Sequence, residues 1–74
     1  MQFDYSKLLG RIKEMGYTQG SLAEEIGTSE STMSLKLNNR AAFTQPDIWR
    51  LCRALAIPGH QIGVYFFTPK VQKN

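Results

Sequence analysis

The stretch from Thr18 to Asn38, TQGSLAEEIGTSESTMSLKLN, constrains the fold of this chain more than any other segment. Its first part is an amphipathic helical pattern, in which Leu22 and Ile26 recur four residues apart and therefore face the same side of a helix. Gly27 follows directly, and a residue without a Cβ atom adopts a positive φ at little cost. The sequence thus predicts a short helix that ends at Gly27 and is followed by a tight turn.

A second short helix is predicted after this turn. The Ser29 hydroxyl can cap it by accepting a hydrogen bond from a first-turn N–H group, and Met33 and Leu37 then form its inward face. Ala23, in the first helix, is small enough to allow a close crossing of the two helices. Helix, three-residue turn and helix are together typical of a helix-turn-helix motif, although an ordinary helical hairpin has the same outline.

This motif resembles that of the lambda-repressor-like, or Cro/xenobiotic-response-element, family of helix-turn-helix proteins. The resemblance covers roughly residues 4–62, and five positions carry it: Gln19, Ala23, Gly27, Ser29 and Met33. The whole chain is also similar to small Cro-like proteins and modulator-of-repression proteins of temperate phages of Gram-positive bacteria. The resemblance implies a compact all-α domain of five helices that acts in the switch between lysis and lysogeny. Lys36 departs from the family pattern, which usually has an apolar residue at that position.

Length and composition set further limits. The 74 residues, 42% of them hydrophobic, suffice for one domain with one core. Cys52 and His60, each the only residue of its type, can form neither an intramolecular disulfide nor a four-ligand zinc site, so we expect no metal and no cofactor. No apolar run approaches the ~20 residues of a membrane helix, and no signal peptide is recognisable. We expect a protein of the bacterial cytoplasm that is not an enzyme, because no nucleophile with a base and no glycine-rich phosphate loop is identifiable.

The net charge of +3 is unevenly distributed along the chain. Residues 1–35 carry three Lys and Arg against five Asp and Glu, whereas residues 36–74 carry six Lys and Arg against one Asp. The basic half begins within the second helix of the motif. This balance suits contact with phosphates, although a modest excess of cations is also common on soluble domains.

A first helix is predicted before the motif, over about residues 5–15. Asp4 is its expected cap, and Gly16 ends it. Its buried stripe consists of four residues spaced by three or four: Tyr5, Leu8, Ile12 and Met15. Arg11 lies off this stripe and is expected to face solvent.

A fourth helix is predicted after the motif, with Thr44 as its cap and with Asp47 in the first turn, where a negative charge is favourable. Its predicted buried stripe is Ile48, Leu51, Cys52 and Leu55. A short fifth helix is expected over residues 59–64. We therefore predict a helix-turn-helix domain over residues 1–67, with the motif at 18–38, and a C-terminal tail over residues 68–74.

The predicted DNA-binding surface comprises the start of the first motif helix, the turn, the outer face of the second motif helix and the connection after it. The free N–H groups at a helix N-terminus favour a phosphate, and a helix in the major groove presents its first turn and outer face to the bases. By likeness to the family and by this geometry, the expected contacts are Thr18, Gln19, Thr28, Ser29, Glu30, Ser31, Thr32, Ser34, Leu35, Asn38, Asn39 and Arg40. The second motif helix offers no Arg or Gln for a bidentate base contact, and Glu30 repels phosphate.

Two functions therefore stay open. In the first, the protein is a Cro-like repressor that reads operator DNA, as a two-fold dimer with recognition helices ~34 Å apart. In the second, it is an antirepressor or modulator that binds a phage repressor and blocks the repressor's DNA-binding face. Acidic and apolar side chains would then make the contact: Glu24, Glu25, Glu30, Leu35, Trp49, Tyr65, Phe66 and Phe67. Three adjacent aromatics cannot all face one core, so part of the run at 65–67 folds back over the helices or meets another chain.

Overall fold

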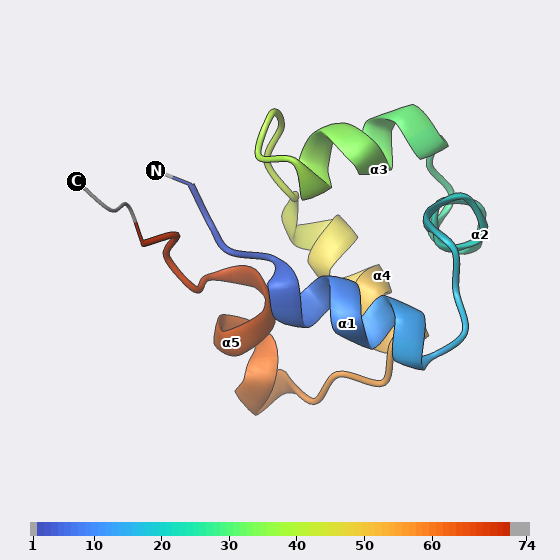
Figure 1. The fold of residues 1–74 in the computed structure, drawn as a ribbon. Coiled ribbons are helices and arrows are strands. Elements are labelled where there is room, and N and C mark those ends of the chain that lie inside the picture. The colour runs from blue at the N-terminus through green and yellow to red at the C-terminus, as the bar shows by residue number, and fades with distance from the viewer. Residues whose placement is uncertain (1, 72–74) are drawn as a thin grey trace.

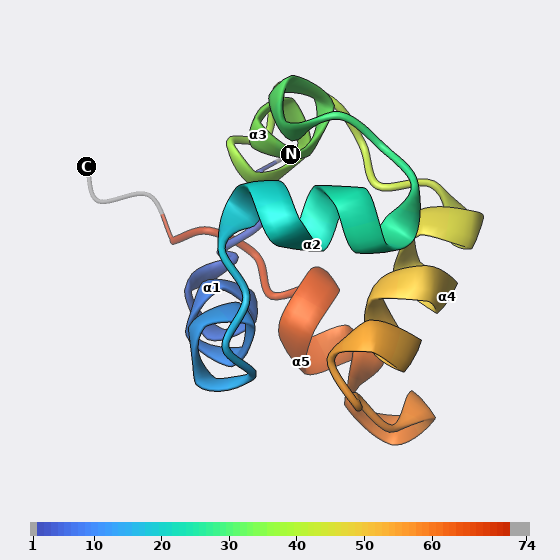
Figure 2. The same cartoon turned by 90° about the vertical axis from the view of Figure 1, so that its right-hand side faces the viewer.

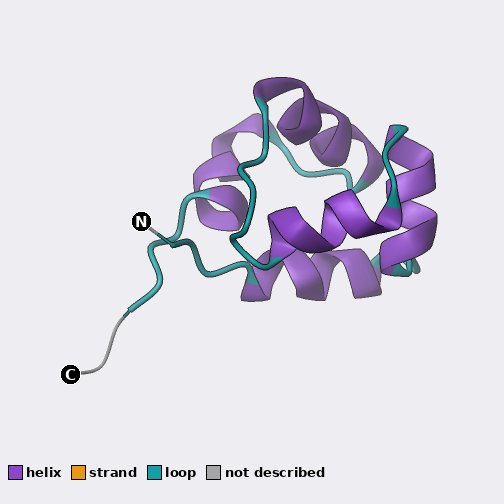
Figure 3. Ribbon diagram, turned by 90° about the horizontal axis from the view of Figure 1, so that it is seen from above, coloured by secondary structure: helices purple, strands orange, loops and turns teal. Residues whose placement is uncertain are grey.

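Helices follow one another along residues 2–71, the part of the chain that this computed structural model describes (Figure 1). Five are α-helices, and one turn of 3-10 helix, η1, precedes the last of them. Their bounds are α1 Ser6–Glu14, α2 Gln19–Ile26, α3 Glu30–Leu37, α4 Gln45–Ala54, η1 Gly59–Gln61 and α5 Ile62–Phe66. The described residues form no strand, as Figure 3 also shows. The prediction of an all-α fold with five helices is confirmed.

α2 crosses the middle of the molecule, with α3 on one side of it and α1 and α5 on the other (Figure 2). It packs against α3 and α4, while α1 packs against α5. Four leucines are completely buried where these helices meet: Leu8, Leu22, Leu51 and Leu55. No helix within residues 2–71 is both long and apolar enough to cross a membrane.

The two motif helices begin and end as the sequence predicts. Thr18 Oγ1 accepts a hydrogen bond from Ser21 N (3.0 Å), and Ser21 Oγ accepts one from Thr18 N (2.9 Å), which closes a capping box. Gly27 ends α2 with φ at +81°, and Ser29 Oγ caps α3 by accepting from Thr32 N at 3.1 Å. The turn between the two helices is therefore fixed by local hydrogen bonds.

α1 differs from its prediction at both ends. The residue before it is Tyr5, whose side chain makes no capping hydrogen bond; Asp4 Oδ1 instead accepts from Ser6 N at 2.8 Å. The expectation that Met15 is buried is wrong, because the helix ends at Glu14 and the chain turns away at Gly16, where φ is +82°. Met15 is therefore not held on the buried stripe.

Arg11 does not simply face solvent. Its Nε donates to the Leu55 carbonyl at 2.8 Å and its Nη2 to the Ala56 carbonyl at 3.4 Å, while Nη1 pairs with Glu14. The last carbonyls of a helix have no partner within the helix, so a cation from a neighbouring helix stabilises them. Arg11 thus joins α1 to the C-terminal end of α4.

The fourth and fifth helices largely follow their predictions. Of the predicted stripe in α4, Leu51 and Leu55 are buried, whereas Ile48 and Cys52 are only partly buried. Burial raises the pKa of the Cys52 thiol, which suits its predicted role as a small core residue. α5 continues to Phe66, beyond its predicted end.

The C-terminal segment begins beside the N-terminus and is not a free tail. Asp4 N donates to the Thr68 carbonyl at 2.7 Å, Lys70 N donates to the Gln2 carbonyl at 3.0 Å, and Phe3 forms an antiparallel β-bridge with Pro69. Residues 72–74, the rest of the predicted tail, lie outside the described residues. The first residues of the tail therefore close the fold by joining its two ends.

Candidate functional site

The outer face of α3 is the centre of the predicted site. Met33 and Leu37 are buried as predicted, and Ser31, Leu35 and Asn38 are exposed. Leu35, at 46% exposure, places a large apolar side chain in the middle of this polar face. The face is thus available to a partner, as the prediction requires.

Several polar groups of this face already bond to one another. Ser29 Oγ, which caps α3, also donates to Thr32 Oγ1 at 2.9 Å and lies 3.3 Å from Ser31 Oγ. Asn38 Nδ2 donates to the Ser34 carbonyl at 2.8 Å and lies 3.3 Å from Ser34 Oγ. Reading a base with these groups requires exchanging local hydrogen bonds for base contacts, which reduces the net gain.

Asn39, predicted to contact DNA, instead binds the backbone of Phe3. Its Oδ1 accepts from Phe3 N and its Nδ2 donates to the Phe3 carbonyl, both at 2.9 Å. Its backbone has φ at +62°, a left-handed conformation that asparagine tolerates better than most residues. Both ends of the side-chain amide are therefore engaged in holding the N-terminal segment, and the prediction of a DNA contact by Asn39 is not supported by this geometry.

The Glu30 carboxylate lies over the first turn of α2. A Cβ atom placed on Gly20 would be 3.3 Å from Glu30 Oε1 and 3.5 Å from Oε2, so the glycine leaves room for the carboxylate. The N-terminal end of a helix attracts negative charge because its N–H groups are unpaired. Glu30 thus already brings a negative charge to the region around Gln19 where a DNA phosphate was expected.

Lys36, the only cation of α3, turns away from the outer face. Its Nζ forms an ion pair with Asp47 Oδ2, and the two side chains are only 15% and 12% exposed. Asp47 Oδ2 also accepts from Thr44 N at 2.9 Å, and Asp47 N donates to Thr44 Oγ1 at 3.2 Å. Burial alone would raise the pKa of Asp47, but the hydrogen bonds from Lys36 and Thr44 outweigh it and hold that pKa below its usual value.

This pair explains why a lysine is compatible with a position that is usually apolar in similar motifs. The aliphatic part of Lys36 is buried between α3 and α4, and its ammonium group finds a carboxylate at the N-terminus of α4. As a consequence, no Lys or Arg within Glu30–Leu37 points to the outer face. Arg40, beyond the end of α3, is the exposed cation nearest in sequence to that helix.

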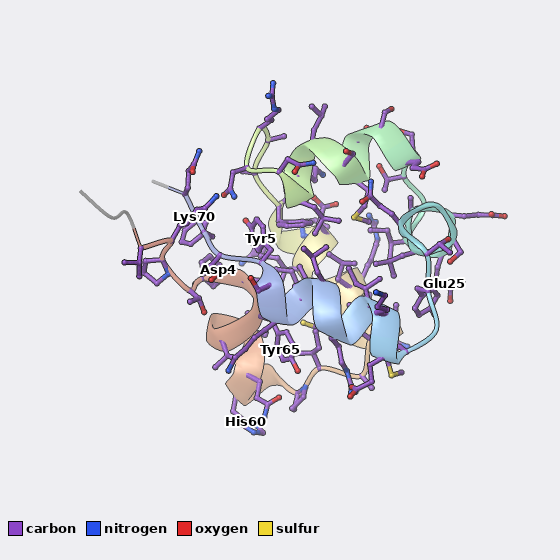
Figure 4. The ribbon with its side chains drawn as sticks, viewed as in Figure 1. Asp4, Tyr5, Glu25, His60, Tyr65 and Lys70 are labelled. Carbon is purple, nitrogen blue, oxygen red and sulfur yellow. The ribbon has the colours of Figure 1, made fainter. Side chains whose placement is uncertain are left out.

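The residues expected to bind a partner protein do not all lie on one surface, although Glu25 and Trp49 line the same depression. Trp49 is 61% exposed on α4, and Phe67 is half exposed with its ring edge-on to Phe3, at 5.7 Å between centroids. Phe66 is only 2% exposed and packs edge-on against Phe43, so its predicted contact with a partner is wrong for this fold. Tyr65, labelled in Figure 4, is half-buried against the core.

Comparison with known proteins first defines the family. The model of the family described as "Protein of unknown function (DUF739)" matches residues 1–69, and the chain belongs to this family. That description names no function and no DNA-binding motif. A search of curated proteins finds no match.

The chain is similar over nearly its whole length to a solved structure. It is the solution structure of the modulator of repression (MOR) of the temperate bacteriophage TP901-1 from Lactococcus lactis, which is 40% identical to this chain. The match covers 97% of each chain, with a TM-score of 0.79. The likeness supports a small phage regulator with this all-helical fold.

Proposed function

We propose that this protein modulates a phage repressor by binding to it, and that the outer face of α3 makes the contact. The observation that carries the proposal is its likeness, over nearly the whole chain, to a modulator of repression. This was the second of the two functions left open by the sequence. The electrostatics of the α2–α3 surface favour it over direct reading of DNA.

The negative charge of the α2–α3 surface suits a partner protein with a basic face. The Glu30 carboxylate lies over the first turn of α2, and Lys36, the only Lys or Arg of α2 and α3, is paired with Asp47, so these two helices offer carboxylates and no unpaired cation. A DNA reader obtains most of its affinity from cations that neutralise phosphates. A repressor's DNA-binding face carries such cations, and a carboxylate on this surface complements them.

Leu35 supplies the apolar part of the proposed contact. Leu35 is 46% exposed, and covering its apolar side chain with a partner removes that surface from water, which favours binding. Ser31 and Asn38 would form the polar rim on either side. Against DNA, the same leucine could make only a thymine-methyl contact.

A titration of fluorescent DNA from the adjoining regulatory region tests the proposal, with and without the cognate repressor and at two salt concentrations. We expect no binding by the protein alone and release of the repressor from the DNA when the protein is added. Leu35→Ala should weaken this release, whereas Val64→Ala, which changes a similarly exposed residue on α5, should not. Tight DNA binding by the protein alone, falling by roughly 0.9 log unit per log unit of salt for each phosphate neutralised, would instead establish direct readout.

A further inference from the structure

Trp49 forms an exposed patch that the proposed function does not use. It is the only tryptophan of the chain and is 61% exposed on α4. Arg53, one turn further along the helix, stacks on it, with the guanidinium carbon 4.8 Å from the ring centroid. Arg50 is also exposed beside them. Tryptophan and arginine are the residues most enriched where interfaces obtain their affinity.

Acidic charge borders the same patch from another helix. Glu25, at the C-terminal end of α2, lines a shallow depression together with Trp49, Arg50 and Arg53. Figure 2 shows this end of α2 running up to α4, and Figure 4 labels Glu25 at the outer side of α2. Within residues 2–71, none of the three charged side chains of this depression forms an ion pair. The tryptophan patch, defined as Glu25, Trp49, Arg50 and Arg53, thus presents both signs of charge around one exposed aromatic ring.

Such a patch fits a second copy of itself. A basic partner face would meet two arginines, and an acidic partner would meet Glu25, so neither pairs all the charges. In a two-fold dimer the patch of one copy contacts the same patch of the other copy, rotated by 180°. The Glu25 carboxylate of each copy can then meet the arginines of the other. We propose that the tryptophan patch is a homodimer interface, with the Trp49 rings meeting near the axis and Glu25 of each copy paired with Arg50 and Arg53 of the other.

Self-association through α4 is independent of the function proposed for α3. The patch is formed by α4 and the C-terminal end of α2. Leu35 and Glu30 both belong to α3, and the Glu30 carboxylate lies over the opposite, N-terminal end of α2. The dimer would therefore leave both α3 surfaces free. A monomeric chain would leave the result of the repressor experiment unchanged. Failure to bind the repressor would likewise leave the dimerisation experiment unchanged.

Sedimentation equilibrium of the purified chain over a range of concentrations tests the proposal. The average mass should rise from 8.4 kDa toward that of a dimer, and the fluorescence of Trp49, the sole tryptophan, should shift to shorter wavelength over the same range. Trp49→Ala should keep the mass at the monomer value. A wild-type chain that stays monomeric at millimolar concentration overturns the proposal.

Charge reversal provides the sharper test, because a two-fold interface predicts complementation. Glu25→Arg and Arg50→Glu should each weaken self-association at least about tenfold, since like charges then face each other. An equal mixture of the two variants should associate more strongly than either variant alone, because the side chain at position 25 of each copy then meets an opposite charge at position 50 of the other, although Arg53 is unchanged. Glu24→Arg, a reversal at an exposed neighbour outside the depression, is the matched control and should associate like the wild type.

Two results of this experiment contradict the interface. If Glu24→Arg weakens association as much as Glu25→Arg, only net charge matters and the patch is not the contact. If the mixture associates no more strongly than either variant alone although circular dichroism shows both variants folded, the two charges do not meet across a two-fold axis.

Discussion

The ion pair between Lys36 and Asp47 should be the most strongly coupled polar contact of this domain. The two side chains are 15% and 12% exposed, so removing one partner leaves a charge with little access to water. Breaking a fully buried pair in this way costs about 3–5 kcal/mol. Because these ends retain some water contact and Asp47 keeps its hydrogen bond from Thr44 N, we expect about 1–3 kcal/mol for Lys36→Met and for Asp47→Asn alike.

A double-mutant cycle separates the pair from its surroundings. Asparagine retains an oxygen that can accept from Thr44 N, so Asp47→Asn removes mainly the charge. The double variant lacks both charges and should lose less stability than the two single variants together, by about 1–2 kcal/mol. Urea unfolding followed by circular dichroism measures each value, provided that the m-value stays constant.

The reasoning fails if the two changes are additive within about 0.3–0.5 kcal/mol, which is what independent sites show. It would then follow that the two residues contribute to stability separately, Lys36 through its aliphatic chain and Asp47 through the cap of α4. Neutral effects of both single variants would contradict the burial of the pair itself.

Three other predictions concern stability. The pKa of Asp47 is lower in the folded protein than its unfolded value near 3.8, so the ionised carboxylate stabilises the fold fully above that value. This stabilisation is lost as the pH falls through the lower folded pKa. Asp47→Asn should therefore make the free energy of unfolding depend less on pH below about pH 4. Leu22→Ala should cost about 2–5 kcal/mol because it opens a cavity, whereas Leu9→Ala, at a half-exposed site, should cost far less in the same urea assay. Asn39→Ala and Asn39→Gly both lose the two hydrogen bonds to the N-terminal segment, but only alanine is strained at φ +62°, so the glycine variant should have the higher midpoint.

Local chemistry made the helix boundaries predictable from the sequence. Thr18, Ser29 and Thr44 each cap the helix that follows through an N–H three residues ahead, and Gly27 takes the positive φ that its position required. Interactions of this kind depend on a few neighbouring residues. Together with the three- and four-residue spacing of apolar side chains, these caps predicted the fold class and most of the buried faces; Met15, predicted to be buried, is exposed.

Contacts between helices were not predictable in the same way. Asn39 bonds to a residue 36 positions away, and Arg11 bonds to a carbonyl 44 positions away. Nothing in the local sequence distinguishes these side chains from solvated ones, because their partners are backbone groups of other segments. The candidate site was affected most, since Asn39 and Lys36 both proved to be occupied within the chain.

α4 connects the two surfaces proposed for this protein. Lys36 of α3 is held at its N-terminal end through Asp47, and Arg11 of α1 is held at its C-terminal end through the Leu55 carbonyl. Polar contacts at both ends, with completely buried Leu51 between them, fix the rotation of α4 about its own axis. The direction in which Trp49 projects is therefore set by the same contacts that position α3. It follows that a substitution which breaks the Lys36–Asp47 pair should disturb repressor binding and self-association together, whereas Leu35→Ala and Trp49→Ala should each affect one of them.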